Sequence, residues 1–290
     1  NIKPAINTSS EFGFDTKFFK NRIGLNFTYY IENRKNEIIP ISISKGSGYD
    51  TFLTNAGESE RKGVEITFNA TPVKTEDFNW DFTFNFGKNK TTVISLPGDL
   101  TSLNAPGGSD AYGFATVVHE LGNQWGQLKG TAIKRDAQGN AVINANGTYA
   151  VNPGQYLGSV LPDFTGGIIN SVRYKNFSLN AAIDFQKGGK FFSLSEMWGA
   201  SSGLTAETAA LNDKGINVRE AVADGGGVHV KGVDATGAAV DKYAEGYTYF
   251  TQFYGNRLAE SYIHNASYMK LRDVSLSYSL PKSLLKNMFS

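Results

Sequence analysis

The sequence contains no cysteine, so disulfides and thiolate metal sites are excluded. Charge of one sign is also lacking: 28 basic and 27 acidic residues among 290 leave a net charge of +1, which predicts no nucleic-acid partner. No run of about 18 apolar residues predicts a membrane-spanning helix, and the first residues lack the apolar stretch of a signal peptide. A membrane β-barrel stays possible, because its strands carry a much weaker hydropathy signal.

Glycine and aromatic residues are plentiful instead, with 32 Gly, 20 Phe and 14 Tyr, which favours strands and turns. The clearest pattern lies at 55–86 and predicts two strands joined by a turn at 72–77. Successive side chains of a strand point to opposite faces. The second strand therefore has one face made of Phe78, Trp80, Phe82, Phe84 and Phe86. A face this apolar needs a thick protein core or lipid to cover it.

The same alternation recurs and predicts seven strands in all. They are expected at 8–19, 22–33, 64–71, 78–87, 164–174, 177–186 and 267–280. The first half of the last strand is out of phase with its second half, which predicts a β-bulge near Arg272 and Asp273. Five aromatic side chains are expected to face lipid: Phe12, Phe27, Phe68, Phe82 and Phe185.

The connections between these strands run short, long, short, long, short, long. Tight turns at one end and long loops at the other are typical of an outer-membrane barrel. We therefore predict an all-β fold: a partial antiparallel transmembrane β-barrel wall of about seven strands with long extracellular loops. Since bacterial single-chain barrels have even strand numbers, residues 1–290 are expected to be part of a larger barrel domain, with 282–289 leading into a further strand.

The long connectors carry weaker signals. Residues 136–140 and 144–147 predict the turns of small hairpins. Thr205–Ala223 is expected to contain a short helix. The carboxylates on the inward face of the wall, expected to pair with Lys17 and Arg173, are Glu11, Asp15, Glu65, Asp81 and Asp184.

Four stretches resemble a known family when taken together. They are Asn-Ala-Gly-Glu at 55–58 with Lys-Gly-Val-Glu at 62–65; Thr-Pro-Val at 71–73 with Phe-Asn-Trp at 78–80; Leu-Pro-Asp-Phe-Thr-Gly-Gly at 161–167 with Tyr-Lys-Asn-Phe at 174–177; and Asn265–Arg272 with Tyr278–Pro281. In combination they resemble the C-terminal barrel of SusC/RagA-type TonB-linked outer-membrane proteins of the Bacteroidetes.

This resemblance implies a barrel of about 22 strands with a plugged lumen in the outer membrane. It further implies uptake of a glycan or peptide, driven by TonB and assisted by a SusD-like surface lipoprotein. We expect no plug domain, the region through which TonB would act, within residues 1–290. A passive porin-like channel and a surface ligand-binding barrel remain as alternatives, since alternation alone does not separate them.

Catalytic and metal motifs are weak. Gly199-Ala200-Ser201-Ser202-Gly203 matches G-x-S-x-G, and His229 follows Asp213 and Asp224 in hydrolase order, but the flanks lack the apolar strand of a nucleophile elbow. His119, His229 and His264 lack metal-ligand spacing. The 136–140 loop lacks the acidic positions of a calcium site, and the glycines at 225–227 lack the following Lys-Ser/Thr of a phosphate loop. We expect no enzyme, no metal and no cofactor.

Aromatic residues in the long connectors are the candidates for binding substrate or partner. Aromatic rings stack on sugars and fill apolar contact sites; packing of the loops against each other is the alternative for each. We select Tyr112, Trp125, Trp198, Tyr247 and Tyr254, and note Phe114, Tyr249 and Phe250 beside them. The rim of the barrel is expected at Leu96–Val160 and Ser193–Ser261.

Overall fold

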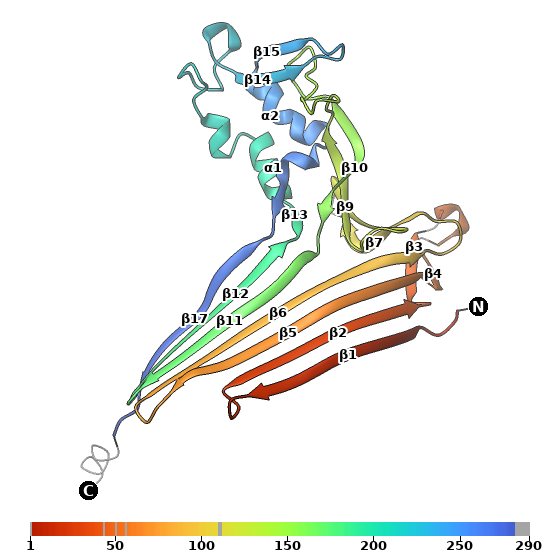
Figure 1. The fold of residues 1–290 in the computed structure, drawn as a ribbon. Coiled ribbons are helices and arrows are strands. Elements are labelled where there is room, and N and C mark those ends of the chain that lie inside the picture. Colours follow the sequence, from red (N-terminus) through yellow and green to blue (C-terminus); the bar gives the residue numbers. More distant parts are fainter. Residues whose placement is uncertain (1, 43, 50, 56, 110–111, 282–290) are drawn as a thin grey trace.

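A single tilted sheet of seven antiparallel strands dominates the computed structural model, which describes residues 2–42, 44–49, 51–55, 57–109 and 112–281 (Figure 1). Each strand pairs with the next one along the chain among these seven. In spatial order they are β1 (Ile6–Phe18), β2 (Ile23–Lys35), β5 (Glu58–Lys74), β6 (Phe78–Ser95), β11 (Pro162–Tyr174), β12 (Phe177–Gly188) and β17 (Tyr268–Tyr278). All seven predicted strands are confirmed. The expected connection at 282–289 lies outside the described residues.

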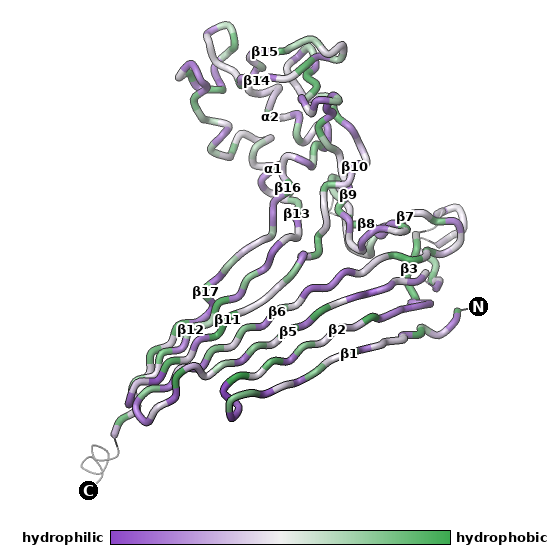
Figure 2. Tube along the Cα trace, in the orientation of Figure 1, coloured by the Kyte–Doolittle hydropathy of each residue, from purple (hydrophilic) through white to green (hydrophobic). Residues whose placement is uncertain are grey.

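The apolar residues of neighbouring strands meet on one face of this sheet. Along one row, Phe84 pairs with Phe68 and Ile168, and Ile168 pairs with Ile183. Figure 2 shows the matching alternation of hydropathy along the strands. On β6 the continuous apolar run ends at Phe86, and Lys88 and Lys90 follow on the same face. The apolar band thus has about the length, 9–11 residues, that a tilted strand needs to span a membrane.

One hydrogen-bonded polar pair and a group of aromatic rings make the apolar band compatible with contact to lipid. Asn170 interrupts the apolar face, and Trp80 Nε1 donates a hydrogen bond of 3.2 Å to its Oδ1, so neither group is left unsatisfied. Near the short turns, Tyr174 pairs with Phe177 and Phe78, and Phe177 pairs with Tyr278. Aromatic rings gathered at this level are typical of the interfacial girdle of a membrane barrel.

The predicted bulge in the last strand is present at Arg272. The pairing with β12 passes from Asp273 to Leu271, which leaves Arg272 as the extra residue. The bulge brings both halves of β17 into the same phase, so Leu271 and Val274 lie on the apolar face together. On the other face, Arg272 Nη2 donates to Asp184 Oδ2 at 2.7 Å.

This contact corrects the pairing expected for the inward carboxylates. Asp184 bonds to Arg272 and Tyr268, and Asp81 accepts from the Thr71 hydroxyl at 2.7 Å. Among the described residues, neither Lys17 nor Arg173 forms an ion pair. The register explains the difference, because β1 lies several strands from Asp184 and Arg173 stands opposite Asn79 and Ser178.

The three short connections lie at one end of the sheet and the three long ones at the other, as predicted (Figure 1). The first long connection forms a hairpin of β3 (Ile38–Ser42) and β4 (Thr51–Asn55) around the 3₁₀ turn η1 (Lys45–Ser47). The second forms a four-stranded sheet in the order β10 (Val151–Ser159), β9 (Gln127–Ile133), β8 (Ala115–Glu120) and β7 (Ser102–Ser109). Turns at 136–140 and 144–147 are confirmed.

The third long connection contains two helices and two small strand pairs. Its elements are β13 (Lys190–Phe192), α1 (Leu194–Ser201), η2 (Ala206–Ala209), η3 (Val222–Asp224), β14 (Val228–Val233), β15 (Ala239–Ala244), α2 (Gly246–Gly255), η4 (Ala259–Tyr262) and β16 (Ile263–Asn265). The short helix expected within Thr205–Ala223 is present as the 3₁₀ helix η2, and η3 begins at the end of that range. No helix in the described ranges is long and apolar enough to cross a membrane.

The second and third connections share a hydrophobic core, and we call the structure they form (residues 96–161 and 189–267) the loop body. Its largest cluster joins Phe114 of the second connection to Met197, Phe250 and Leu258 of the third. Among the described residues, nearly all buried apolar side chains lie in this body rather than in the seven-stranded wall. The wall therefore depends on its surroundings to cover its apolar face.

Candidate functional site

Three of the five selected aromatic residues come together on the surface of the loop body. The rings of Tyr112 and Trp198 lie 4.7 Å apart between centroids, and those of Trp198 and Tyr254 lie 6.5 Å apart. Trp198 comes from α1, Tyr254 from α2 and Tyr112 from the second connection. We call these three residues the Trp198 patch. Each is at least one-third exposed, and a hollow of about 270 Å³ beside Trp198 and Tyr254 is also lined by Ser201, Ser202 and Thr251.

Helical spacing places a fourth selected residue on the same side. Tyr247, Thr251 and Tyr254 stand four and three residues apart on α2, so they share one helix face. Tyr247 is 83% exposed. The adjoining side of the helix carries Phe250 and Phe253 into the core.

The three other aromatic residues noted in the sequence, Phe114, Tyr249 and Phe250, pack the loops against each other. Phe114 is 4% exposed and Phe250 is 9% exposed, and both belong to the core of the loop body. Tyr249 packs against the same core, and its hydroxyl lies 3.3 Å from that of Tyr149. Phe114 nevertheless supports the Trp198 patch from below, with its ring 5.4 Å from that of Tyr254.

Trp125 lies apart from the patch, in the turn between β8 and β9. Its indole stacks on His119 with centroids 3.5 Å apart and planes 18° apart. Burial lowers the pKa of His119 to about 4, so the imidazole is neutral at pH 7, and its Nδ1 accepts from the Gly126 amide. The Trp125 amide donates to the Thr91 carbonyl at 2.8 Å, which ties the turn to β6.

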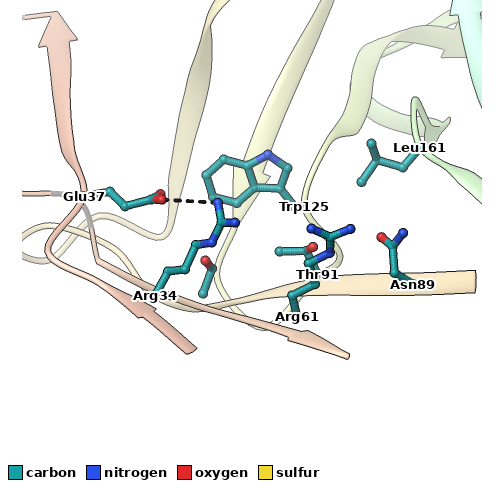
Figure 3. A pocket seen from close by; sticks show the side chains of 8 residues that line it. Arg34, Glu37, Arg61, Asn89, Thr91, Trp125 and Leu161 are labelled. Atoms are coloured by element: carbon teal, nitrogen blue, oxygen red, sulfur yellow. Dashed lines mark ion pairs between the residues drawn. The ribbon is translucent and has the colours of Figure 1, made fainter. Parts of the chain in front are cut away.

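A pocket of about 320 Å³ opens beneath Trp125 at the end of the wall that carries the long connections (Figure 3). Its other lining residues are Arg34, Glu37, Ser59, Arg61, Asn89, Thr91 and Leu161. We call it the Trp125 pocket. Sequence reasoning selected Trp125 but missed the charged residues. The available signal was that Arg34, Arg61 and Thr91 continue the inward-facing phase of their strands beyond the apolar band.

The weaker catalytic motif does not form a nucleophile elbow. Ser201 ends helix α1 rather than following a strand, and its hydroxyl donates to the Phe250 carbonyl at 3.2 Å. His229 lies between Asp213 and Asp241, and His264 pairs with Glu196. Within the described ranges, no three His, Asp or Glu side chains converge in a manner that would hold a metal ion.

Comparison with known proteins agrees with this architecture. The profile of the family described as "TonB dependent receptor-like, beta-barrel" matches residues 1–287. The chain belongs to this family. It is a SusC/RagA-type barrel chain of the outer membrane, and its long connections are extracellular loops.

Individual relatives of this TonB-dependent receptor chain are distant but match it almost from end to end. TonB-dependent receptor P3 of Formosa agariphila is 26% identical over 98% of the chain, which covers 28% of that protein. TonB-dependent receptor SusC of Bacteroides thetaiotaomicron is 24% identical over 96% of the chain, which covers 26% of it. The chain thus spans little more than a quarter of these relatives.

Solved structures show the same fold. A chain of the RagAB peptide importer in its "closed-closed" state superimposes with a TM-score of 0.66 at 17% identity, over 97% of this chain and 30% of that one. The "open-open" state gives a TM-score of 0.66 at 18% identity, over 96% and 28%.

Proposed function

We propose that this chain forms part of the wall and outer rim of an active importer that brings a nutrient across the outer membrane. Residues 1–290 would lie wholly within the barrel domain, and energy would come from TonB through a plug region outside this sequence. The observation that carries the proposal is the family match over residues 1–287, combined with a seven-stranded wall whose second and third long loops fold into one body. Transport rather than catalysis is the proposed activity.

A SusD-like surface lipoprotein is the proposed partner, and a glycan or peptide is the proposed substrate class. The relatives named SusC and RagAB support this choice. The Trp198 patch offers the contact surface, because it presents three rings and several hydroxyl groups on a body held rigid by its own core. Tyr247 would extend this surface along α2. Rings of this kind contribute strongly when a contact buries them.

Two other functions are possible rivals: a passive porin-like channel and a surface ligand-binding barrel without transport. TonB dependence separates them. Cells that carry the full-length protein are supplied with a defined panel of oligosaccharides and peptides, and depletion of each compound is followed by mass spectrometry. We expect at least one compound to be taken up only when both the protein and TonB are present. Uptake that persists without TonB would favour the channel, and binding without any uptake would favour the surface-binding barrel.

The Trp198 patch is tested by Trp198→Ala in the full-length protein. Burying a Trp at a contact centre contributes about 2 kcal/mol, so we expect roughly a 30-fold loss of affinity for the lipoprotein or the substrate. Co-purification and uptake are the measurements. Leu204→Ala is the matched control, because Leu204 is a highly exposed apolar residue of the same body. Unchanged binding in Trp198→Ala, with the barrel assembled, would show that the patch only packs the loops.

A further inference from the structure

The floor of the Trp125 pocket is built where three neighbouring strands rise above the apolar band. Arg61 of β5 stands opposite Glu32 of β2 and Thr91 of β6. One row further out, Ser59 stands opposite Arg34. These side chains point to the inward face of the wall, because their positions continue the polar phase of each strand. The floor therefore presents charged and hydroxyl groups to the lumen at its extracellular entrance.

The two arginines of this floor differ in their partners. Arg34 is neutralised: its Nε donates to Glu32 Oε1 at 3.0 Å, and its Nη1 lies 3.6 Å from Glu37 Oε1. Glu32 also accepts from Asn7 Nδ2 at 2.7 Å, so its carboxylate is already engaged. The lining itself carries Arg34, Arg61 and Glu37, and Glu32 bonds to Arg34 from beside it, so the two arginines face two carboxylates.

Arg61 interacts with Glu32 only at longer range, through charge, and not by a direct bond. In the described part of the chain it forms no ion pair, and its Nε is buried without a hydrogen-bond partner. A buried donor without an acceptor is rare and calls for an explanation. The guanidinium is held over the ring of Tyr30, 5.5 Å from its centroid, and Figure 3 shows it pointing into the space between Trp125, Asn89 and Leu161.

The Trp125 indole forms the roof of the pocket. Ring stacking and backbone hydrogen bonds hold it in place. Stacking on His119 sets the plane of the Trp125 indole, and the turn that carries it makes further backbone bonds to β6. The Gly122 amide donates to the Val93 carbonyl at 2.8 Å, and the Val93 amide donates to the Asn123 carbonyl at 3.0 Å. An aromatic ring, an unpaired guanidinium and several hydroxyl and amide groups are thus held around one cavity.

We infer that the Trp125 pocket binds a carboxylate of the transported substrate, with Arg61 as the residue that recognises it. This inference rests on the proposed import function and names a chemical group that the substrate carries. The planar guanidinium donates two parallel hydrogen bonds to a carboxylate, which suits Arg better than Lys for this task. A pocket of about 320 Å³ is at the lower end of ligand sites, so it accommodates one unit of a longer substrate.

Two sources of carboxylate fit this chemistry: a uronate unit of an acidic glycan, and an acidic side chain of a peptide. In either case Trp125 would contact the apolar part of the unit, and Thr91, Ser59 and Asn89 would bond its polar groups. Glu37 would oppose a second negative charge at the outer side of the pocket, so we expect one carboxylate to be bound per pocket.

The experiment uses the full-length protein in detergent, labelled with 5-fluorotryptophan, with the ¹⁹F resonance of Trp125 assigned by its loss in Trp125→Phe. The glycan probe is trigalacturonate against its methyl ester. The peptide probe is acetyl-Ala-Glu-Ala-amide against acetyl-Ala-Gln-Ala-amide. We expect one acidic probe to shift the Trp125 resonance with at least tenfold lower Kd than its neutral counterpart, which identifies the source of the carboxylate.

Arg61→Gln is expected to abolish this preference, and Arg61→Lys to reduce it. The matched control is Arg173→Gln, which removes the same charge from the same face of the wall at its opposite end. Asn89→Asp provides a second route, because it adds a negative charge to the pocket and leaves Arg61 in place; we expect at least tenfold weaker binding of the acidic probe. Equal binding of acidic and neutral probes, or an unchanged preference in Arg61→Gln and Asn89→Asp, would overturn the inference.

Failure of this inference and failure of the import proposal give different results. TonB-dependent uptake without any preference for a carboxylate would remove the inference and leave the importer standing. A carboxylate preference that depends on Arg61, in a protein whose uptake does not need TonB, would remove the active importer and leave the binding site.

Discussion

At the scale of single residues, Gly63 prepares the Trp125 pocket although it does not line it. It stands opposite Tyr30 on the inward face, and a Cβ at this position would approach the Tyr30 ring to 2.3 Å. The missing side chain therefore lets the ring lie flat over the strand, where it supports the Arg61 guanidinium. Glycine normally weakens the interior of a strand. At position 63 its missing side chain leaves the space that the Tyr30 ring occupies.

We expect Gly63→Ala to move Tyr30 and to weaken carboxylate binding. A cation–π contact of this kind is worth about 0.5–1 kcal/mol, which corresponds to a loss of roughly two- to fivefold. The measurement is the Kd of the acidic probe that binds the unsubstituted protein. Gly24→Ala is the control, because a Cβ there would meet its nearest atom only at 3.8 Å. An equal Kd in both variants would show that Tyr30 does not position Arg61.

His119 gives the roof of the pocket a defined response to acid. Its pKa is lowered by burial to about 4, below the ordinary value of 6.5, so the folded turn prefers the neutral imidazole. When the turn opens, the His119 imidazole binds a proton more readily. The neutral imidazole therefore stabilises the folded turn fully above pH 6.5, and this stabilisation is lost as the pH falls toward 4.

We therefore expect the ¹⁹F resonance of Trp125 to report opening of the turn in this window, with most of the change near pH 4. His119→Gln keeps a hydrogen-bond acceptor for the Gly126 amide and removes the titration, so its resonance should stay constant over the same range. The same pH response in this variant would assign the opening to other groups.

At the scale of elements, the strands of the wall could be predicted because each one separates two environments. The alternation at Phe78–Phe86 exists since one face meets lipid and the other the lumen, and this requirement is local to the strand. The bulge at Arg272 was visible for the same reason, as a break in phase.

The loop body follows a different rule, which explains why its elements were missed. Helix α2 is built from Tyr, Phe and Thr between two glycines, residues with weak helix propensity and stronger strand preference. It forms because Phe250 and Phe253 pack against Phe114, more than 130 positions away in the sequence. The surroundings of Arg61 likewise depend on the strand register and on the docking of the Trp125 turn, which no single stretch of sequence encodes.

Glu260 of η4 joins the two long connections of the loop body. Its Oε2 accepts from the Ile133 amide at 2.6 Å, and its Oε1 accepts from Arg135 Nη2 at 3.2 Å. A hydrogen bond to a charged group contributes about 1.5–3 kcal/mol. We expect Glu260→Ala to raise amide hydrogen exchange in β9 by tenfold or more, while the wall strands keep their protection.

The control for this change is Glu207→Ala, an exposed carboxylate of the same body. Equal exchange in β9 for the two variants would mean that the shared apolar core alone holds the connections together. A rise in exchange throughout the wall would instead show that the loop body and the barrel unfold as one unit.

At the scale of the whole molecule, the chain divides its stabilisation between two surroundings. The loop body buries its own apolar side chains, whereas the described wall leaves large ones such as Phe12, Phe177 and Leu276 exposed on its apolar face. Phe68, Phe82, Phe84 and Phe185 form ring contacts along the same face. In the outer membrane, lipid covers this face, so the wall needs no protein layer there.

The two faces of β6 offer a sharp test of this division, because neighbouring residues experience opposite environments. Phe84 lies on the apolar face, paired with Phe68 and Ile168, while Thr83 lies on the inward face and donates to Asn69 Oδ1 at 2.9 Å. An Arg near the middle of the lipid face costs about 2–4 kcal/mol, and a lumen position tolerates it far better. We expect Phe84→Arg to lower the yield of heat-resistant folded barrel in the outer membrane much more than Thr83→Arg, measured on the full-length protein by gel shift and urea unfolding. Equal yields would mean that the aromatic face is covered by protein, and the seven strands would then belong to a closed core instead of a membrane wall.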